Sequence, residues 1–116
     1  MKKDDTVFLR HILDAIQYID GYVGGLAFDQ FLQRRMTQDA VVRQLEIIGE
    51  ASNSLSADLR EAHPDVMWGQ IIGMRNRLIH GYFQIDLEIV WEVVHVDLPA
   101  LRAQVAHLLE ETGRER

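Results

Sequence analysis

The stretch TQDAVVRQLEIIGEASNSL, residues 37–55, shows the pattern that decides the fold. Its apolar side chains recur at the three- and four-residue spacing of one helix face, and they include Val41, Leu45, Ile48 and Leu55. Thr37 is the expected N-cap, Asp39 in the first turn suits the helix dipole, and the helix is expected to run to about Ser54. One side of this helix therefore needs other apolar elements to cover it.

The same helical spacing continues along the chain, and only two prolines interrupt it. It predicts helices at about 5–22, 28–35, 37–54 and 68–81. A short helix capped by Ser56 should end before Pro64, and Asp86 should cap a long final helical stretch. Pro99 should kink or restart that stretch, with Asp97 as its possible new cap. The pattern predicts one all-α domain over residues 1–116, an up-and-down bundle of four to five helices.

Composition limits the kind of protein that this chain forms. Its 116 residues, 47% hydrophobic and 26% charged, suit one soluble domain with its own core. The absence of cysteine excludes disulfides and thiolate metal sites. The N-terminus does not resemble a signal peptide, and no run reaches the ~18 apolar residues of a membrane span, so a cytoplasmic protein is expected. The net charge of −6 disfavours broad attraction to nucleic acid, so any RNA contact must be local.

The segment MRNRLIHGYF, residues 74–83, gathers polar side chains within an otherwise amphipathic chain. Arg75 lies one helical turn from both Ile71 and Ile79, which places it on or beside the apolar stripe of its own helix. A guanidinium there either pairs with a carboxylate from a neighbouring helix or is held ready for a phosphate. Position alone leaves both interpretations open.

His80 is expected at the end of the same helix, before Gly81, where exposed carbonyls stabilise an imidazolium. It shares a face with Asn76 one turn earlier, and it is either a cap or a functional group. Tyr82 either packs its ring with the hydroxyl at the surface or presents that hydroxyl beside the arginine and histidine. Because Arg75 and His80 would be about 140° apart around an ideal helix, they converge poorly. Either the backbone leaves the helix at His80, or a second copy of the chain completes the site.

A second polar row is expected on the helix at 37–54, consisting of Asp39, Arg43, Glu46, Glu50 and Asn53. Such a row is either a solvated face with weak ion pairs or a source of counter-charge for Arg75. The remaining histidines show no metal-binding spacing, and the chain contains no phosphate-binding glycine loop or nucleophile motif.

The octet at 75–82 reads arginine, asparagine, three further residues, histidine, any residue and tyrosine. This pattern resembles the HEPN-domain ribonuclease toxins of the HepT type, the toxin halves of HEPN–MNT toxin–antitoxin pairs. Residues 34–39, RQLEIIGEA at 43–51, the helix at 68–82 and DLEIVWEVV followed by DLP within 86–99 look like the same family. The resemblance therefore covers most of the chain.

The resemblance implies an all-helical, HEPN-like homodimer in which the arginine and histidine of both protomers line one interface cleft. It implies a metal-independent RNA endonuclease without a cofactor. A minimal nucleotidyltransferase antitoxin would neutralise it by attaching AMP to the motif tyrosine. Carried over, Arg75 and His80 would be catalytic and Tyr82 would be modified. Asn76 would be a supporting polar residue. From their positions in the sequence, Arg77, Glu46 and Glu50 are further candidates for a supporting or RNA-binding role.

This chemistry is coherent, because metal-free RNA cleavage needs a base for the 2′-hydroxyl proton, an acid for the leaving oxygen and a cation beside the phosphorane. Histidine supplies the first two and arginine the third. Two other hypotheses stay open. One is a catalytically silent helical dimer that binds a nucleotide or a nucleotidyltransferase partner. The other is a structural role in which Arg75 pairs internally with Glu46 or Glu50.

Overall fold

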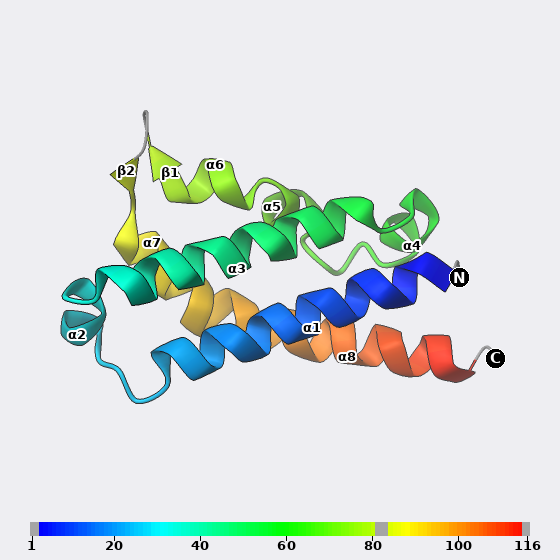
Figure 1. Ribbon diagram of the computed structural model, residues 1–116. Coiled ribbons are helices and arrows are strands. Elements are labelled where there is room, and N and C mark those ends of the chain that lie inside the picture. Colours follow the sequence, from blue (N-terminus) through cyan, green and yellow to red (C-terminus); the bar gives the residue numbers. More distant parts are fainter. Residues whose placement is uncertain (1–2, 81–83, 115–116) are drawn as a thin grey trace.

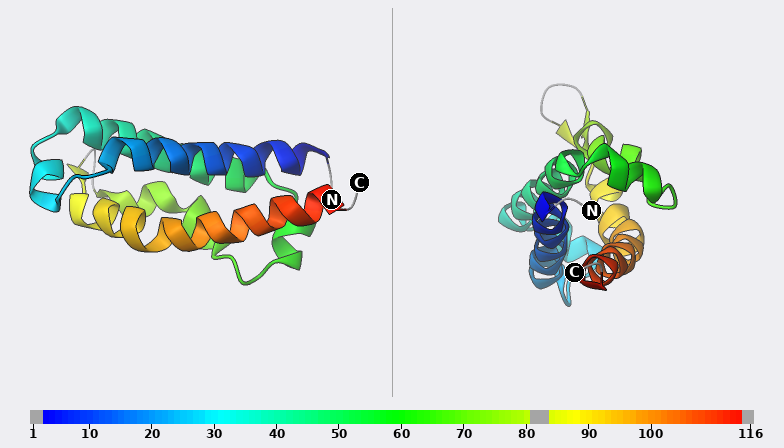
Figure 2. Two further views of the ribbon diagram at one scale, coloured as in Figure 1. Left: turned by 90° about the horizontal axis from the view of Figure 1, so that it is seen from below. Right: turned by 90° about the vertical axis from the view of Figure 1, so that its right-hand side faces the viewer.

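Three long helices run the length of the molecule (Figure 1): α1 (Lys3–Val23), α3 (Arg35–Ser54) and α8 (Leu98–Arg114). The computed structural model describes residues 3–80 and 84–114. Helix α1 runs opposite to α3 and α8, and two further views show the three packed around a shared axis (Figure 2). Apolar stripes of all three meet in the core, represented by Ile12 and Ile16, Leu45 and Ile48, and Val105 and Leu108. The expected all-α up-and-down architecture is confirmed.

The start of α3 differs from the expectation. The helix begins at Arg35 with Arg34 as its N-cap, so Thr37 lies inside the helix and its predicted capping role is wrong. A short helix, α2 (Phe28–Leu32), leads almost directly into α3, and the buried Gln38 side chain donates to the Phe31 carbonyl at 2.9 Å. This contact ties α2 to the start of α3, which has no side-chain cap hydrogen bond.

Asp39 lies beyond the first turn of α3, so its expected position in that turn is also wrong. Its carboxylate accepts a hydrogen bond from Arg35 Nε at 3.2 Å instead.

The helix expected at 68–81 is broken. Helix α5 (Trp68–Ile72) and helix α6 (Met74–Leu78) are separated by Gly73, and the chain becomes extended at Ile79. Strand β1 (Ile79–His80) then pairs antiparallel with β2 (Gln84–Ile85), with His80 opposite Gln84. The Asp86 N–H donates to the Leu78 carbonyl at 2.8 Å. The chain that follows β2 therefore supplies a hydrogen-bond donor to the last residue of α6. The predicted stop at Gly81 lies outside the described residues.

Gly49 explains how closely α5 approaches α3. A Cβ at this position would lie 3.0 Å from the Ile71 carbonyl oxygen and 3.5 Å from that of Ile72. Only a residue without a side chain allows this contact without a shift of the backbone. The approach places α6, and with it Arg75, beside the polar side of α3.

The final helical stretch is continuous through a π-helical turn. Asp86 caps α7 (Leu87–Glu92), as expected, by accepting from Ile89 N at 3.1 Å. The turn at Val93–Asp97 then leads into α8, with the Leu98 N–H bonded to the Val93 carbonyl. This wider turn accommodates Pro99, which has no N–H, without a restart. The expected role of Asp97 as a new cap is therefore wrong.

The beginning of α1 and the end of α8 lie at one end of the bundle, together with α4 (Ala57–Ala62) (Figure 1). Ser56 caps α4, as expected, by accepting from Leu59 N at 3.2 Å. The buried Asp5 carboxylate accepts from the Ser56 backbone N–H at 2.8 Å and from its hydroxyl at 2.7 Å. Asp5 thereby ties the first turn of α1 to the cap of α4.

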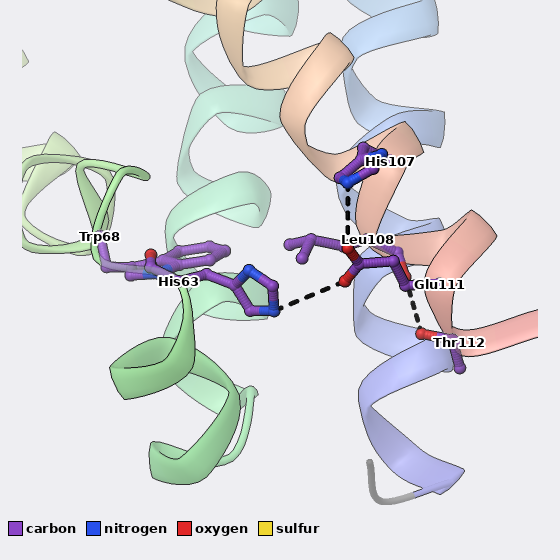
Figure 3. A network of polar contacts seen from close by, with 6 residues as sticks. All are labelled: His63, Trp68, His107, Leu108, Glu111 and Thr112. Atoms are coloured by element: carbon purple, nitrogen blue, oxygen red, sulfur yellow. Dashed lines mark hydrogen bonds and ion pairs between the residues drawn. The ribbon is translucent and has the colours of Figure 1, made fainter. Parts of the chain in front are cut away.

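Glu111 on α8 contacts His63, which lies in the connection between α4 and α5 (Figure 3). Its two oxygens lie 3.8 Å from His63 Nε2 and 2.9 Å from His107 Nε2. The buried Trp68 donates its indole N–H to the His63 carbonyl at 3.0 Å. Helix α4 and the end of α8 lie at the end of the bundle opposite the β1–β2 pair (Figure 1).

Candidate functional site

Arg75 projects from α6 into a cavity of about 230 Å³ between α3 and the α5–α6 segment. Glu46, Gly49, Glu50 and Asn53 line the α3 side of this cavity. The Arg75 side chain is exposed, and within residues 3–80 and 84–114 it makes no hydrogen bond or ion pair. Its five N–H donors are therefore directed at solvent in an arrangement that suits an anionic oxygen ligand.

The alternative in which Arg75 pairs internally with Glu46 or Glu50 is not found among the described residues. Glu50 instead lies 3.6 Å from Arg43, and both side chains are more than half exposed. The interpretation of Arg75 as a buried or boundary cation is wrong because Met74 and Leu78 form the buried face of α6 and leave the Arg75 side chain exposed. The polar row of α3 is thus partly a solvated face and partly a wall of the Arg75 cavity.

The charges around this cavity limit what one copy of the chain can bind. Glu46 and Glu50 place two carboxylates on the wall opposite one guanidinium. Both repel a phosphate that Arg75 attracts, although Arg43 offsets part of the charge of Glu50. Strong binding of an RNA backbone at this cavity therefore needs further positive groups.

His80 lies on β1 rather than at a helix end, because the chain becomes extended one residue earlier, at Ile79. The helix-terminal environment and the shared face with Asn76 that the sequence suggested are therefore absent. The imidazole is 57% exposed, and its Nε2 lies 3.5 Å from Asp86 Oδ2. It is accessible to a ligand and has a carboxylate beside one ring nitrogen.

His80 lines a second, open cavity of about 530 Å³. Its apolar walls come from Phe28 and Leu32 of α2 and from Ile85 and Leu87, and its polar side chains include Gln84, Asp86 and Glu88. Apolar walls beside exposed polar groups suit a ligand with a flat apolar face and polar edges. Sequence reasoning missed these walls, since α2 and α7 are brought together only by the fold.

Arg77 points away from both of these cavities. Its Nη1 donates to Asp97 Oδ2 at 3.2 Å, joining α6 to the π-helical turn. The pair lines a third cavity of about 300 Å³ with Met67, Ile71, Val96 and Leu101. In this chain the Arg77 guanidinium already has a carboxylate partner.

The structure describes one of the two remaining predicted site residues, Asn76, and not the other, Tyr82. Asn76 is exposed on α6 and, among the residues that the structure describes, its side chain has no hydrogen-bond partner. Tyr82 lies outside the described residues. In the described part of the chain, no group of three His, Asp or Glu side chains could hold a metal ion. No described helix is long and apolar enough to cross a membrane.

Comparison with known proteins finds ribonucleases of one family. The family model of ribonuclease HepT-like proteins matches residues 12–108. A protein of Thermococcus cleftensis named "Probable ribonuclease HepT" is 38% identical over 108 residues, covering 93% of this chain and 98% of that protein. A candidate RNase of Caldanaerobacter subterraneus subsp. tengcongensis is 39% identical over 109 residues, covering 94% of this chain and 97% of that protein.

A longer relative from Methanocaldococcus jannaschii is named as a gamma-glutamylcyclotransferase and candidate RNase, and it is 38% identical over 116 residues. The match covers 100% of this chain and 52% of that protein, so the chain spans about half the length of this relative. No solved structure matches the chain.

Proposed function

Because this chain belongs to the ribonuclease HepT-like family, we propose that it is a metal-independent RNA endonuclease that uses Arg75 and His80. The observation that carries the proposal is the state of Arg75, which is exposed in a cavity and has no partner among the described residues. A cation that neither packs nor pairs contributes little to stability. Its five donors match the oxygens of a phosphodiester.

The proposed reaction is attack of the RNA 2′-oxygen on the adjacent phosphorus. His80 takes the 2′-hydroxyl proton, and Arg75 stabilises the extra negative charge of the phosphorane. The bond from phosphorus to the 5′-oxygen breaks, and an imidazolium protonates that leaving oxygen. The products are a 2′,3′-cyclic phosphate end and a 5′-hydroxyl end.

We propose further that the active form is a homodimer in which the cleft combines both copies of the motif. Arg75 and His80 of one chain line separate cavities, and Glu46 and Glu50 oppose phosphate binding by a single Arg75. A two-fold axis near the motif would bring two guanidiniums and two imidazoles together, which raises the local positive potential despite the net charge of −6.

The proposed regulation is that of a toxin–antitoxin pair. Tyr82 follows His80 by two residues, so AMP added to its hydroxyl by a partner nucleotidyltransferase would place anionic phosphate next to the histidine. That phosphate would compete with RNA for the Arg75 guanidinium.

The test combines RNA cleavage with intact mass. Purified wild type, Arg75→Ala and His80→Ala are incubated with tRNA and mRNA in the presence of a chelator. We expect wild type to generate cyclic phosphate ends and both variants to be inactive while folded. Equal cleavage by His80→Ala and wild type would overturn the assignment. AMP-sized mass steps that appear with the partner and are lost in Tyr82→Phe test the regulation.

A second candidate is a silent module that binds a nucleotide or a nucleotidyltransferase. The observation that favours it is the pair of carboxylates in the Arg75 cavity, which disfavour a long polyanion. It predicts binding of ATP or AMP that Arg75→Ala abolishes, without turnover of any RNA.

A further inference from the structure

Asp86 uses its two carboxylate oxygens for two different partners. Oδ1 accepts from the Ile89 backbone N–H at 3.1 Å, which caps α7. Oδ2 lies 3.5 Å from Nε2 of His80. Because the cap holds Asp86 at the start of α7, its free oxygen has a defined position beside the imidazole.

The backbone explains why these two side chains meet. His80 pairs with Gln84 and Ile79 pairs with Ile85 in the short antiparallel ladder. The Asp86 N–H then bonds to the Leu78 carbonyl at 2.8 Å. Both residues are therefore tied to the end of α6, the helix that carries Arg75.

We propose that Asp86 is a positioning residue that holds a proton on His80 Nε2 and leaves Nδ1 as the atom that accepts the substrate proton. The role of Nδ1 rests on the endonuclease function proposed above. The separation of 3.5 Å is an ion-pair distance, and it must shorten to about 3 Å to become a hydrogen bond. Such bonds commonly tighten when substrate binds.

The arrangement defines where the proton goes. The 2′-hydroxyl proton moves to Nδ1 as the oxygen attacks phosphorus, and Nε2–H stays with Asp86. The carboxylate then stabilises the imidazolium, which gives up the Nδ1 proton to the leaving 5′-oxygen. Without the carboxylate, a larger fraction of the neutral rings carries the proton on Nδ1. In that form Nδ1 cannot accept the substrate proton.

The dual role of Asp86 allows a test that separates capping from positioning. Asp86→Asn and Asp86→Ser both keep a good N-cap residue for α7. Asn removes the charge, and Ser is too short to cap the helix and reach the imidazole together. The matched control is Glu92→Gln, which removes one negative charge from an exposed position on the same helix.

Two measurements are made on the full chain. We expect both Asp86 variants to lower kcat for RNA cleavage at least about 10-fold at unchanged KM, with the unfolding midpoint retained. Nitrogen-15 NMR of the imidazole should show a larger fraction of the Nε2–H tautomer of neutral His80 in wild type than in Asp86→Ser. The Glu92→Gln protein should behave as wild type in both measurements.

The two measurements also separate the two proposals. Unchanged kcat in both Asp86 variants, with wild type active, would overturn the positioning role and leave the endonuclease assignment intact. An inactive wild type would overturn the endonuclease assignment, and the NMR measurement would still decide whether Asp86 sets the tautomer. An equal Nε2–H fraction of His80 in wild type and Asp86→Ser would overturn the inference in either case.

Discussion

Arg75 and His80 lie only five residues apart in the sequence, yet they line two different cavities of the chain. Arg75 faces the polar side of α3, and His80 faces the apolar pocket formed with α2 and α7. The extended backbone at Ile79 separates them, since it redirects the chain between the two residues. A site that uses both on one phosphate is therefore easier to form between two chains than within one.

Mixed dimers test that relationship. We expect Arg75→Ala and His80→Ala proteins to be inactive alone and to recover activity when refolded or co-expressed together. If each site takes its arginine from one chain and its histidine from the other, half of the dimers in an equal mixture are mixed. Each of these regains one of two sites, so roughly a quarter of the wild-type rate returns.

The control for mixed dimers is a chain that carries both substitutions, mixed with the Arg75→Ala protein. This mixture contains no intact arginine and should stay inactive. If the first mixture also shows no recovery, while size-exclusion chromatography confirms mixed dimers, the pairing of residues across the dimer is wrong.

Arg75 and Arg77 should differ in their effect on stability. Arg75 has no partner among the described residues, so Arg75→Met should change the free energy of unfolding by less than about 0.5 kcal/mol. Arg77→Met breaks the half-buried pair with Asp97 and should cost up to about 1 kcal/mol. Urea denaturation of both variants measures the difference, and a larger loss for Arg75→Met would show that Arg75 has a structural role.

Gly49 should tolerate a side chain poorly. In Gly49→Ala the new Cβ meets the Ile71 carbonyl oxygen at 3.0 Å, so α5 must move from α3 at a cost of about 1–3 kcal/mol. Gly21→Ala is the matched control, because a Cβ there meets nothing within 4 Å and the helix of α1 gains up to about 1 kcal/mol. Thermal unfolding should shift in opposite directions, and equal shifts would contradict the close contact.

The sequence predicted the long helices well because their apolar spacing is regular over many turns. It also identified the Ser56 and Asp86 caps, since a short polar side chain before an apolar run has a local physical signature. It failed at 68–81, where apolar spacing alone could not show that close packing at Gly49 and the return of the chain at Asp86 would interrupt the helix.

The sequence names candidate site residues and leaves their geometry open, and their catalytic role stays a prediction. Arg75 and His80 follow from the motif, but the helix model placed His80 on the face of Asn76, where it does not lie. Asp86 was recognised as a cap alone, because its contact with His80 depends on the register of a two-residue ladder. Contacts of that kind depend on tertiary structure and leave no periodic signal in the sequence.

Asp5 should be the most sensitive acidic residue of the first helix. It is 2% exposed and accepts both polar hydrogens of Ser56, while the Ser56 hydroxyl oxygen accepts from Leu59. Asp5→Ala leaves the two Ser56 donors without a partner and should cost about 1–3 kcal/mol. Asp5→Asn keeps one acceptor and should cost less, and the exposed Asp14→Ala should cost less than about 0.5 kcal/mol. Chemical denaturation gives this ranking, and an Asp5→Ala protein as stable as Asp14→Ala would show that the link between α1 and α4 contributes no net stability.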